Sequence, residues 1–424
     1  MNFILKGNIC YSKTPQELQV LENGYIVCEN GVSKGAFSAI PEMYRAFRVV
    51  DYGDCVIIPG LCDIHVHAPQ FAFRSLGMDM ELLEWLNTYT FPEESKYVEI
   101  DYANIAYGHF VDALRRGATT RAVVFATLHT PATVMLMEKL ERSGLVSFVG
   151  KVNMDRNCPD FLRAESADAA YLSTKAWIES TKDAYKNTSP ILTARFIPTC
   201  SDELMKRIKE LQIEYGLPVQ SHLSESPGEI EWVRKLCPND ATYGGAYDRF
   251  GLFGGEGVPT IMAHCVWSEG AEEELIRDNG VYVAHCPQSN INLASGIAPI
   301  RRFLKNGIRV GLGSDVAGGC HTSIFRAISD AVQVSKLYWR LVDQSDAPLK
   351  VEEAFYLGTA GGGSFFGKVG SFDEGYEFDA VVIDDSGISS SNPLKVEERL
   401  ARIIYLSDDN CIRGKYARGK KIKL

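Results

Sequence analysis

Short apolar runs alternate with amphipathic stretches along most of the chain. The runs VVFAT, VSFVGKVN and ILTARFIPT neighbour helix-like stretches such as YANIAYGHFVDALRRG and SDELMKRIKELQIEYG. The last of these stretches opens with Ser201, a favoured helix cap, and closes with Gly216, a usual residue at a helix end. Counted from VIIPGLCDIHV, the pattern predicts about eight strands separated by helices, which is typical of a (β/α)8 TIM-like barrel in an α/β fold.

This alternation of strand-like and helix-like stretches is absent at both ends of the chain. Residues 1–55 contain short β-like runs separated by turn signals such as ENG. The chain from residue 370 onward continues in the same way, with the runs GSFDEGYEFDAVVIDD, RIIYLSDD and RGKYARGKKIKL. We therefore predict that residues 56–369 form the barrel, and that residues 1–55 and 370–424 pair into one small, composite β-rich domain.

Composition and charge narrow the class of protein. Of the 424 residues, 23% are charged and 46% are hydrophobic, as in an ordinary globular protein. The net charge of -10 argues against nucleic-acid binding, and no run of 18 apolar residues suggests a membrane span. The 11 cysteines include no CxxC pair, and several lie in apolar strands. We interpret them as reduced core residues and predict a cytoplasmic protein.

Residues that can bind a metal ion end several of the predicted strands. His65 and His67 follow the apolar run CVIIPGLCDI, and their spacing turns both side chains to one face of a strand. Four later strands also end in a potential ligand: His222, His264, His285 and Asp315. Each residue alone could be a hydrogen-bonded polar group that closes a strand. In a parallel barrel, however, all carboxyl ends of the strands face one mouth, so the set predicts a metal site there.

The ligand types favour one transition-metal ion. Imidazoles with one carboxylate suit Zn²⁺, or as an alternative Fe²⁺, better than Ca²⁺ or Mg²⁺. A two-metal barrel site often uses a bridging, carboxylated lysine on a middle strand, but the fourth strand carries Arg195 and no lysine. We therefore predict one metal ion per chain, with an open position at which water of lowered pKa serves as the nucleophile.

Glu225 follows His222 by three residues in the run HLSE. Beside such a metal site, its carboxyl group could move protons between water, substrate and leaving group. Alternatively, Glu225 serves only the first turn of the following helix, where acidic residues are favoured. His109 and His129 end no predicted strand and are interpreted as ordinary polar residues, whereas the role of His321 stays open.

Several of these motifs resemble a known family. PGLCDIHVH, HLSE, AHC, HCPQSN and GLGSDVAGG resemble the one-metal deaminase branch of the amidohydrolase superfamily, from about residue 50 to 370. Within that branch, HAPQF, LLEWLNTYTFPEE, ARF, HLSES and GLGSDVAGG are similar to the guanine deaminases. The resemblance implies five metal ligands: His65, His67, His222, His264 and Asp315. It leaves open whether His264 binds the metal or forms a hydrogen bond with the attacking water.

The resemblance also implies roles in catalysis and substrate binding. Glu225 would be the proton shuttle, and Asp315 would accept a proton from water, with His264 assisting. Residues implied to bind the purine are Gln70, Arg195, Phe196 and His222. The Gln70 amide offers a donor and an acceptor, and Arg195 offers donors only.

Phe196 could stack on the ring, or it could be a core aromatic, because adjacent residues on a strand face opposite ways unless the strand ends or bulges there. His285 is expected to orient its neighbours through hydrogen bonds.

These expectations together describe a zinc-dependent hydrolase. The resemblance implies hydrolytic deamination of guanine to xanthine and ammonia by a homodimer. The charge and the lack of a long apolar run predict no nucleic-acid or membrane partner. One alternative is a deaminase of another aminopurine such as 8-oxoguanine. Another is a metal-free relative that serves as a scaffold, but such a protein should have lost ligands that this sequence keeps.

Overall fold

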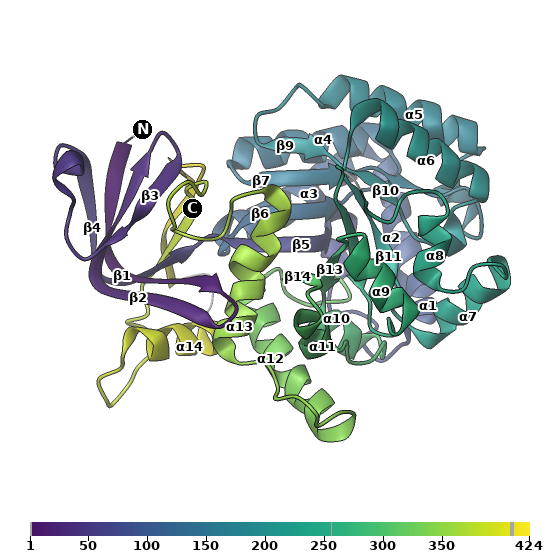
Figure 1. Ribbon diagram of the computed structural model, residues 1–424. Coiled ribbons are helices and arrows are strands. Elements are labelled where there is room, and N and C mark those ends of the chain that lie inside the picture. The colour runs from purple at the N-terminus through teal and green to yellow at the C-terminus, as the bar shows by residue number, and fades with distance from the viewer. Residues whose placement is uncertain (1, 256, 408–410) are drawn as a thin grey trace.

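Strands from both ends of the chain pair in one seven-stranded sheet, visible at the left of Figure 1. The computed structural model describes residues 2–255, 257–407 and 411–424. In hydrogen-bonded order the strands of this sheet are β17 (Lys420–Lys421), β16 (Ile412–Ala417), β15 (Ala380–Ile383), β4 (Arg48–Pro59), β1 (Asn2–Thr14), β2 (Glu17–Glu29) and β3 (Val32–Phe37). The central strand β4 pairs in parallel with β1 and antiparallel with β15, so it joins the two chain ends.

Two details of this sheet differ from the predicted ends. Strand β4 runs to Pro59, beyond the predicted boundary at residue 55. The predicted β-like run RIIYLSDD is wrong as far as Leu406, because these residues belong to helix α14 (Val396–Leu406). Helix α14 buries Leu400, Ile403 and Ile404, a spacing that follows the helical period. Residues 408 and 409 of that run lie outside the described residues.

The middle of the chain forms parallel strands that divide into two sheets. One sheet has the order β14 (Arg309–Leu312), β13 (Tyr282–His285), β12 (Thr260–His264), β11 (Val219–Leu223), β10 (Leu192–Ala194) and β8 (Val152–Asn153). The other has the order β5 (Leu61–His67), β6 (Thr119–Phe125), β7 (Val146–Gly150) and β9 (Thr188–Pro190).

The predicted alternation of parallel strands with helices is confirmed, but a closed ring of paired strands is not found among the described residues. At one seam β9 and β10 are separated only by Ile191, whose N–H group donates to the Val149 carbonyl oxygen at 3.0 Å. At the other seam, a backbone bond of 2.9 Å runs from the Asp315 N–H to the His65 carbonyl, next to the strand ends.

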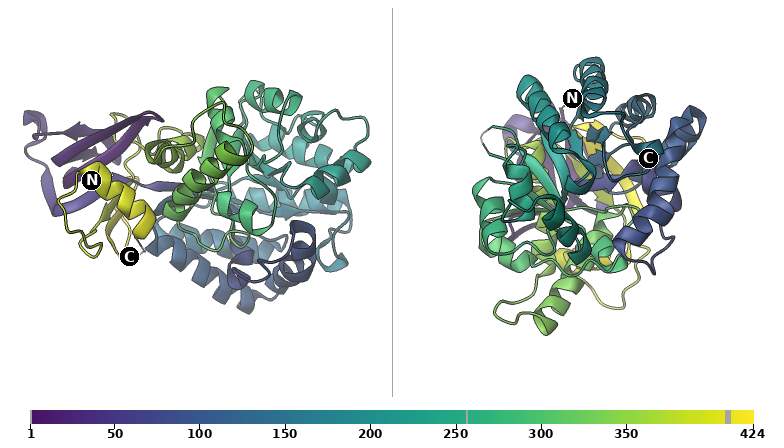
Figure 2. Two further views of the ribbon diagram at one scale, coloured as in Figure 1. Left: turned by 90° about the horizontal axis from the view of Figure 1, so that it is seen from below. Right: turned by 90° about the vertical axis from the view of Figure 1, so that its right-hand side faces the viewer.

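Helices cover the outside of these parallel strands, as both views of Figure 2 show. The longer helices are α3 (Ile100–Arg116), α4 (Thr130–Ser143), α5 (Ala167–Thr181), α6 (Asp202–Tyr215), α7 (Pro227–Leu236) and α12 (Ile324–Leu341). The shorter helices are α1 (Leu82–Trp85), α2 (Phe91–Ser95), α8 (Tyr243–Asp248), α9 (Ala271–Asp278), α10 (Pro287–Asn292), α11 (Ile300–Lys305) and α13 (Val351–Tyr356). Within the described ranges, no helix has both the length and the apolar character needed to cross a membrane.

The predicted limits of α6 are confirmed by its capping geometry. The Ser201 Oγ accepts a hydrogen bond of 3.1 Å from the Leu204 N–H, and Gly216 ends the helix in the left-handed conformation. The apolar face of α6 buries Leu204, Ile208 and Leu211. These local signals could be read from the sequence because they depend only on neighbouring residues.

A buried ion pair connects the two parts of the molecule. Arg121 on β6 donates from Nε to Asp379 Oδ2 at 2.7 Å and from Nη2 to Asp379 Oδ1 at 3.0 Å. Both side chains are fully buried. Asp379 directly precedes β15, so the pair ties a strand of the helix-covered part to the sheet built from the chain ends.

Candidate active site

The predicted ligands gather at the carboxyl ends of the parallel strands. His65 and His67 lie at the end of β5, His222 lies on β11, His264 ends β12, and Asp315 follows β14. The Nε2 atoms of His67 and His222 are 3.2 Å apart. Asp315 Oδ1 lies 3.2 Å from His65 Nε2 and 3.5 Å from His67 Nε2, and its Oδ2 lies 3.7 Å from His264 Nε2. The structure thus brings all five predicted ligands together.

The donors of this cluster fit a metal ion. Ligand atoms of His65, His222 and His264 all lie within 4.8 Å of one another. The Nδ1 atom of His65 is buried and has no hydrogen-bond partner among the described residues, and its Nε2 atom faces the carboxylate of Asp315. Burial lowers the pKa of His65, His67 and His222, which favours the neutral imidazole that binds metals.

Backbone and side-chain acceptors orient two of the rings. His222 Nδ1 lies 2.6 Å from the Arg195 carbonyl oxygen, and His264 Nδ1 lies 2.9 Å from Asn290 Oδ1. Each oxygen accepts a hydrogen bond, so Nδ1 carries the proton and the Nε2 lone pair points toward the cluster.

His264 differs from the other rings in its electrostatics. Burial alone would lower its pKa, but the nearby carboxylates of Glu225 and Asp315 outweigh this effect and raise the pKa. Its Nε2 lies 3.4 Å from Glu225 Oε2. The neutral ring has an Nε2 lone pair for a metal ion, whereas the doubly protonated ring, which the raised pKa favours, can donate from Nε2 to water.

Glu225 faces this cluster and does not cap the following helix. Ser226 caps α7, since its Oγ accepts a bond of 3.2 Å from the Glu229 N–H. The Glu225 side chain is 3% exposed, and its Oε1 accepts a bond of 3.0 Å from Ser295 Oγ. Burial raises the pKa of Glu225 to about 7, so the carboxyl group can both hold and release a proton near neutral pH.

One pocket joins this polar cluster to an apolar wall. Among the predicted site residues, those that line it are His67, Gln70, Arg195, Phe196, His222, Glu225, His264 and Asp315. His65 is fully buried and does not line the pocket. Leu82 and Trp85 of α1, together with Leu86 and Leu293, supply apolar surface. These four residues were not predicted, because an apolar side chain in a pocket and one in the core give the same sequence pattern.

Arg195 and Phe196 both reach the pocket because the strand ends before them. Strand β10 stops at Ala194, and Phe196 precedes a short 3₁₀ turn at Ile197–Thr199. The alternation of strand side chains therefore no longer applies to this pair. The Phe196 and Trp232 rings form a T-shaped pair, with their centroids 6.0 Å apart and their planes at 84°. Phe196 is thus 5% exposed, yet it still lines the pocket.

Glu94 of α2 is a site residue that the sequence analysis missed. Its Oε1 accepts a bond of 3.0 Å from Gln70 Nε2, and its Oε2 accepts one of 2.5 Å from Arg195 Nη1. Glu94 is the last residue of the run LLEWLNTYTFPEE, which was the available signal, but its partner Arg195 lies far away in sequence.

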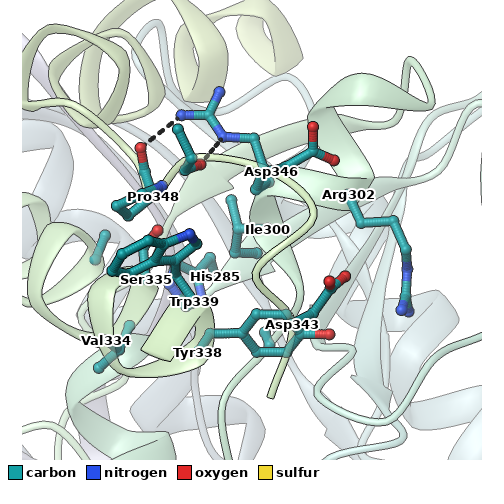
Figure 3. A pocket seen from close by; sticks show the side chains of 14 residues that line it. His285, Ile300, Arg302, Val334, Ser335, Tyr338, Trp339, Asp343, Asp346 and Pro348 are labelled. Carbon is teal, nitrogen blue, oxygen red and sulfur yellow. Dashed lines mark hydrogen bonds between the residues drawn. The ribbon is translucent and has the colours of Figure 1, made fainter. Parts of the chain in front are cut away.

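The expectation for His285 is wrong. Strand β13 turns Tyr282 and Ala284 toward the inner core, so by alternation His285 points outward. It lines a separate cavity beside Ile300 of α11 and Ser335 and Trp339 of α12 (Figure 3). Neither of its buried ring nitrogens has a hydrogen-bond partner among the described residues, so it does not orient the site through hydrogen bonds.

The chain is similar to known proteins over most or all of its length. Residues 56–422 match the model of the amidohydrolase family. The chain is 35% identical to a guanine deaminase of Dictyostelium discoideum, over 99% of this chain and 98% of that protein. It is 33% identical to the guanine deaminase of Escherichia coli K12, over 88% of this chain and 84% of that protein. A crystal structure of guanine deaminase from C. acetobutylicum, with bound guanine in the active site, superposes with a TM-score of 0.97 at 45% identity and covers 100% of both chains.

Proposed function

We propose that this chain, which belongs to the amidohydrolase family, converts guanine and water to xanthine and ammonia. As a member of that family it is a hydrolase that acts on a C–N bond. One observation carries the proposal. A single pocket holds the imidazole cluster, the Glu225 carboxyl group and the polar side chains of Gln70 and Arg195. The guanine deaminases at 33–35% identity and the guanine-bound relative support the choice of base.

The metal proposed for this site is one zinc ion per chain. His65, His67, His222, His264 and Asp315 would hold it. Buried, neutral imidazoles with one carboxylate are ligands that suit zinc. A bound metal would supply a Lewis acid that lowers the pKa of water at the open position.

The protein side chains then divide the proton transfers between them. Water adds to C2 of the purine, and Asp315 accepts a proton from it. Glu225, protonated in part near neutral pH because of its raised pKa, donates a proton to the neighbouring ring nitrogen N3. Asp315 then passes its proton to the exocyclic nitrogen, and the C2–N bond breaks to release ammonia. The hydroxyl group on C2 returns a proton to Glu225, which leaves the C2=O group of xanthine and restores both carboxyl groups.

The purine would lie between the apolar wall and the polar end of the pocket. Phe196, Trp85 and Leu82 offer flat or apolar surface for the ring. Gln70 and Arg195 offer N–H donors for the oxygen at C6. His222 lines the pocket as well and would contact the base from the metal side.

A time course of guanine loss at its ultraviolet absorption band tests the function. We expect xanthine and ammonia in equal amounts, and faster turnover of guanine than of 8-oxoguanine or other aminopurines. Preferred turnover of another base would replace guanine as the substrate. Absence of any deamination by the zinc-loaded protein would contradict the proposal as a whole.

A further inference from the structure

We propose that Glu94 sets the preference for a purine with oxygen at C6, by holding Gln70 and Arg195 so that both present N–H donors to that edge of the base. The inference rests on the proposed function, because it concerns the same pocket. Glu94 acts here as a positioning residue: its two carboxylate oxygens are used by the two side chains, and it is absent from the pocket lining.

The three side chains form one buried group from three elements. Glu94 comes from α2, Gln70 from the 3₁₀ segment Ala68–Phe73, and Arg195 from the residue after β10. Their exposed fractions are 2%, 2% and 3%. A buried carboxylate is retained only when it is well paired, and both oxygens of Glu94 have a donor within 3.0 Å.

Glu94 decides which way the Gln70 amide points. Gln70 Nε2 donates to Glu94 Oε1, and on the other side Gln70 Oε1 accepts a bond of 3.2 Å from the Ala317 N–H. The reversed amide would face its oxygen to the carboxylate and its NH₂ group to the Ala317 N–H, which loses both bonds. The Gln70 amide is therefore fixed, with one N–H hydrogen left for a ligand.

Glu94 also restrains the Arg195 guanidinium. One Nη atom is bound to the carboxylate, and the guanidinium carbon lies 5.2 Å from the centroid of the Phe91 ring. Arginine has five N–H donors, so others remain for the pocket that Arg195 lines. The Glu94 charge offsets the guanidinium charge, so a neutral base can bind without leaving a buried cation unpaired.

A purely structural role for Glu94 makes a different prediction from a positioning role. A residue that only supports folding should affect every ligand of the pocket alike. A residue that aims donors at C6 should affect only ligands with oxygen there. Hypoxanthine and purine separate these cases: neither carries the exocyclic amine, and only hypoxanthine carries oxygen at C6.

Glu94→Gln tests the proposal in the zinc-loaded, full-length protein. Titration calorimetry would measure binding of hypoxanthine and of purine to the parent and the variant. The new amide can turn its NH₂ group toward Gln70 and so permits the reversed arrangement. We expect hypoxanthine affinity to fall by about 10-fold or more, as for a hydrogen bond to a charged group, with purine affinity within about threefold of the parent. The KM for guanine should rise more than kcat falls.

Glu93→Gln is the matched control. Glu93 is the adjacent carboxylate, 6% exposed, and it accepts bonds from Tyr102 Oη and from Lys96 Nζ, away from the pocket. We expect this variant to keep the parent preference for hypoxanthine over purine. If Glu93→Gln loses the preference as well, the effect is not specific to Glu94 and the proposal is wrong.

Two results for Glu94→Gln would overturn the inference: an unchanged preference, or equal losses for both ligands. If this variant does not fold, the same two affinities are measured for Glu94→Asp. The shorter side chain keeps the negative charge but moves the carboxylate away from Gln70 and Arg195. If the parent deaminates guanine and the variant still prefers hypoxanthine to purine, only this inference is contradicted. If the parent neither binds these bases nor deaminates guanine, the proposed function is contradicted as well.

Discussion

Two buried glutamates lie side by side at one corner of the pocket, and their hydrogen-bond partners separate their roles. Glu229 accepts from the Glu225 N–H at 3.0 Å and from Tyr243 Oη at 2.7 Å, so both of its oxygens have a protein donor. Glu225 accepts from Ser295 with one oxygen and turns the other toward His264. Of these two glutamates, only Glu225 has a carboxylate oxygen that faces the imidazole cluster, which supports the proton transfer proposed for it.

Glu225→Gln should therefore remove proton transfer and keep the shape of the site. We expect kcat for guanine to fall by about 10² to 10⁴-fold, the usual contribution of a general acid–base group. Metal content and melting temperature should stay close to those of the parent. Steady-state kinetics with elemental analysis checks this, and near-normal turnover would show that Glu225 moves no essential proton.

Metal binding should also be measurable without an assay of activity. We expect about one equivalent of zinc per chain in protein purified without chelator, because one cluster holds all five ligands. Removal by a chelator should lower the melting temperature, and added zinc should restore it, since a ligand present at 100 times its Kd stabilises the folded state by about 2.7 kcal/mol. Two equivalents that are both needed for activity would contradict the one-metal proposal.

Among single residues, part of the site could be predicted from the sequence. Five strand-end residues converge because parallel strands bring their carboxyl ends together, and this rule needs no coordinates. His285 was misplaced because the parity of a short strand decides whether a side chain faces inward, and β13 turns it outward. The pairing of Glu94 with Arg195 was invisible, because it joins residues that no local pattern relates.

Among the elements, limits were predictable wherever a cap residue marks them. Ser201 and Gly216 bound α6 as expected. The run RIIYLSDD was predicted as β-like, although Leu400, Ile403 and Ile404 follow a helical spacing. Short apolar runs fit both the helical and the strand period, and only packing against the seven-stranded sheet decides between the two structures.

Gly216→Ala and Gly108→Ala should change stability in opposite directions. A Cβ at either position meets no atom within 4 Å, so only the backbone differs. Gly216 has φ 62° and ψ 32°, where an alanine costs about 1 kcal/mol. Gly108 lies inside α3, where alanine stabilises by about 0.5 to 1 kcal/mol. Urea unfolding measures both, and equal signs would contradict the assignment of the α6 end.

For the whole molecule, the sequence indicated alternating strands and helices but not how regularly they pair. The two parallel sheets divide between Thr188–Pro190 and Leu192–Ala194, at a point that no local sequence signal marks. Sequence alone likewise does not show that Arg121 meets Asp379, the buried ion pair between the two parts of the molecule.

Asp379→Asn should destabilise the protein strongly, because it leaves the buried Arg121 charge without its main partner. Loss of one member of a buried pair costs about 3 to 5 kcal/mol. Asp384→Asn, directly after β15, is the control: Asp384 pairs with Arg413, whose side chain is 56% exposed, and such a pair contributes at most about 1 kcal/mol. Denaturant unfolding of both variants checks this, and similar losses would contradict the importance of the buried pair.

The position of β4 between β1 and β15 has a consequence for synthesis on the ribosome. Translation proceeds at about 5 to 20 residues per second, so β1 to β4 emerge long before Ala380–Ile383. During that interval β4 presents a row of unsatisfied backbone N–H and C=O groups along one edge, which is the kind of edge that recruits other chains. Nascent chains stalled before residue 380 should therefore be the species that chaperones engage.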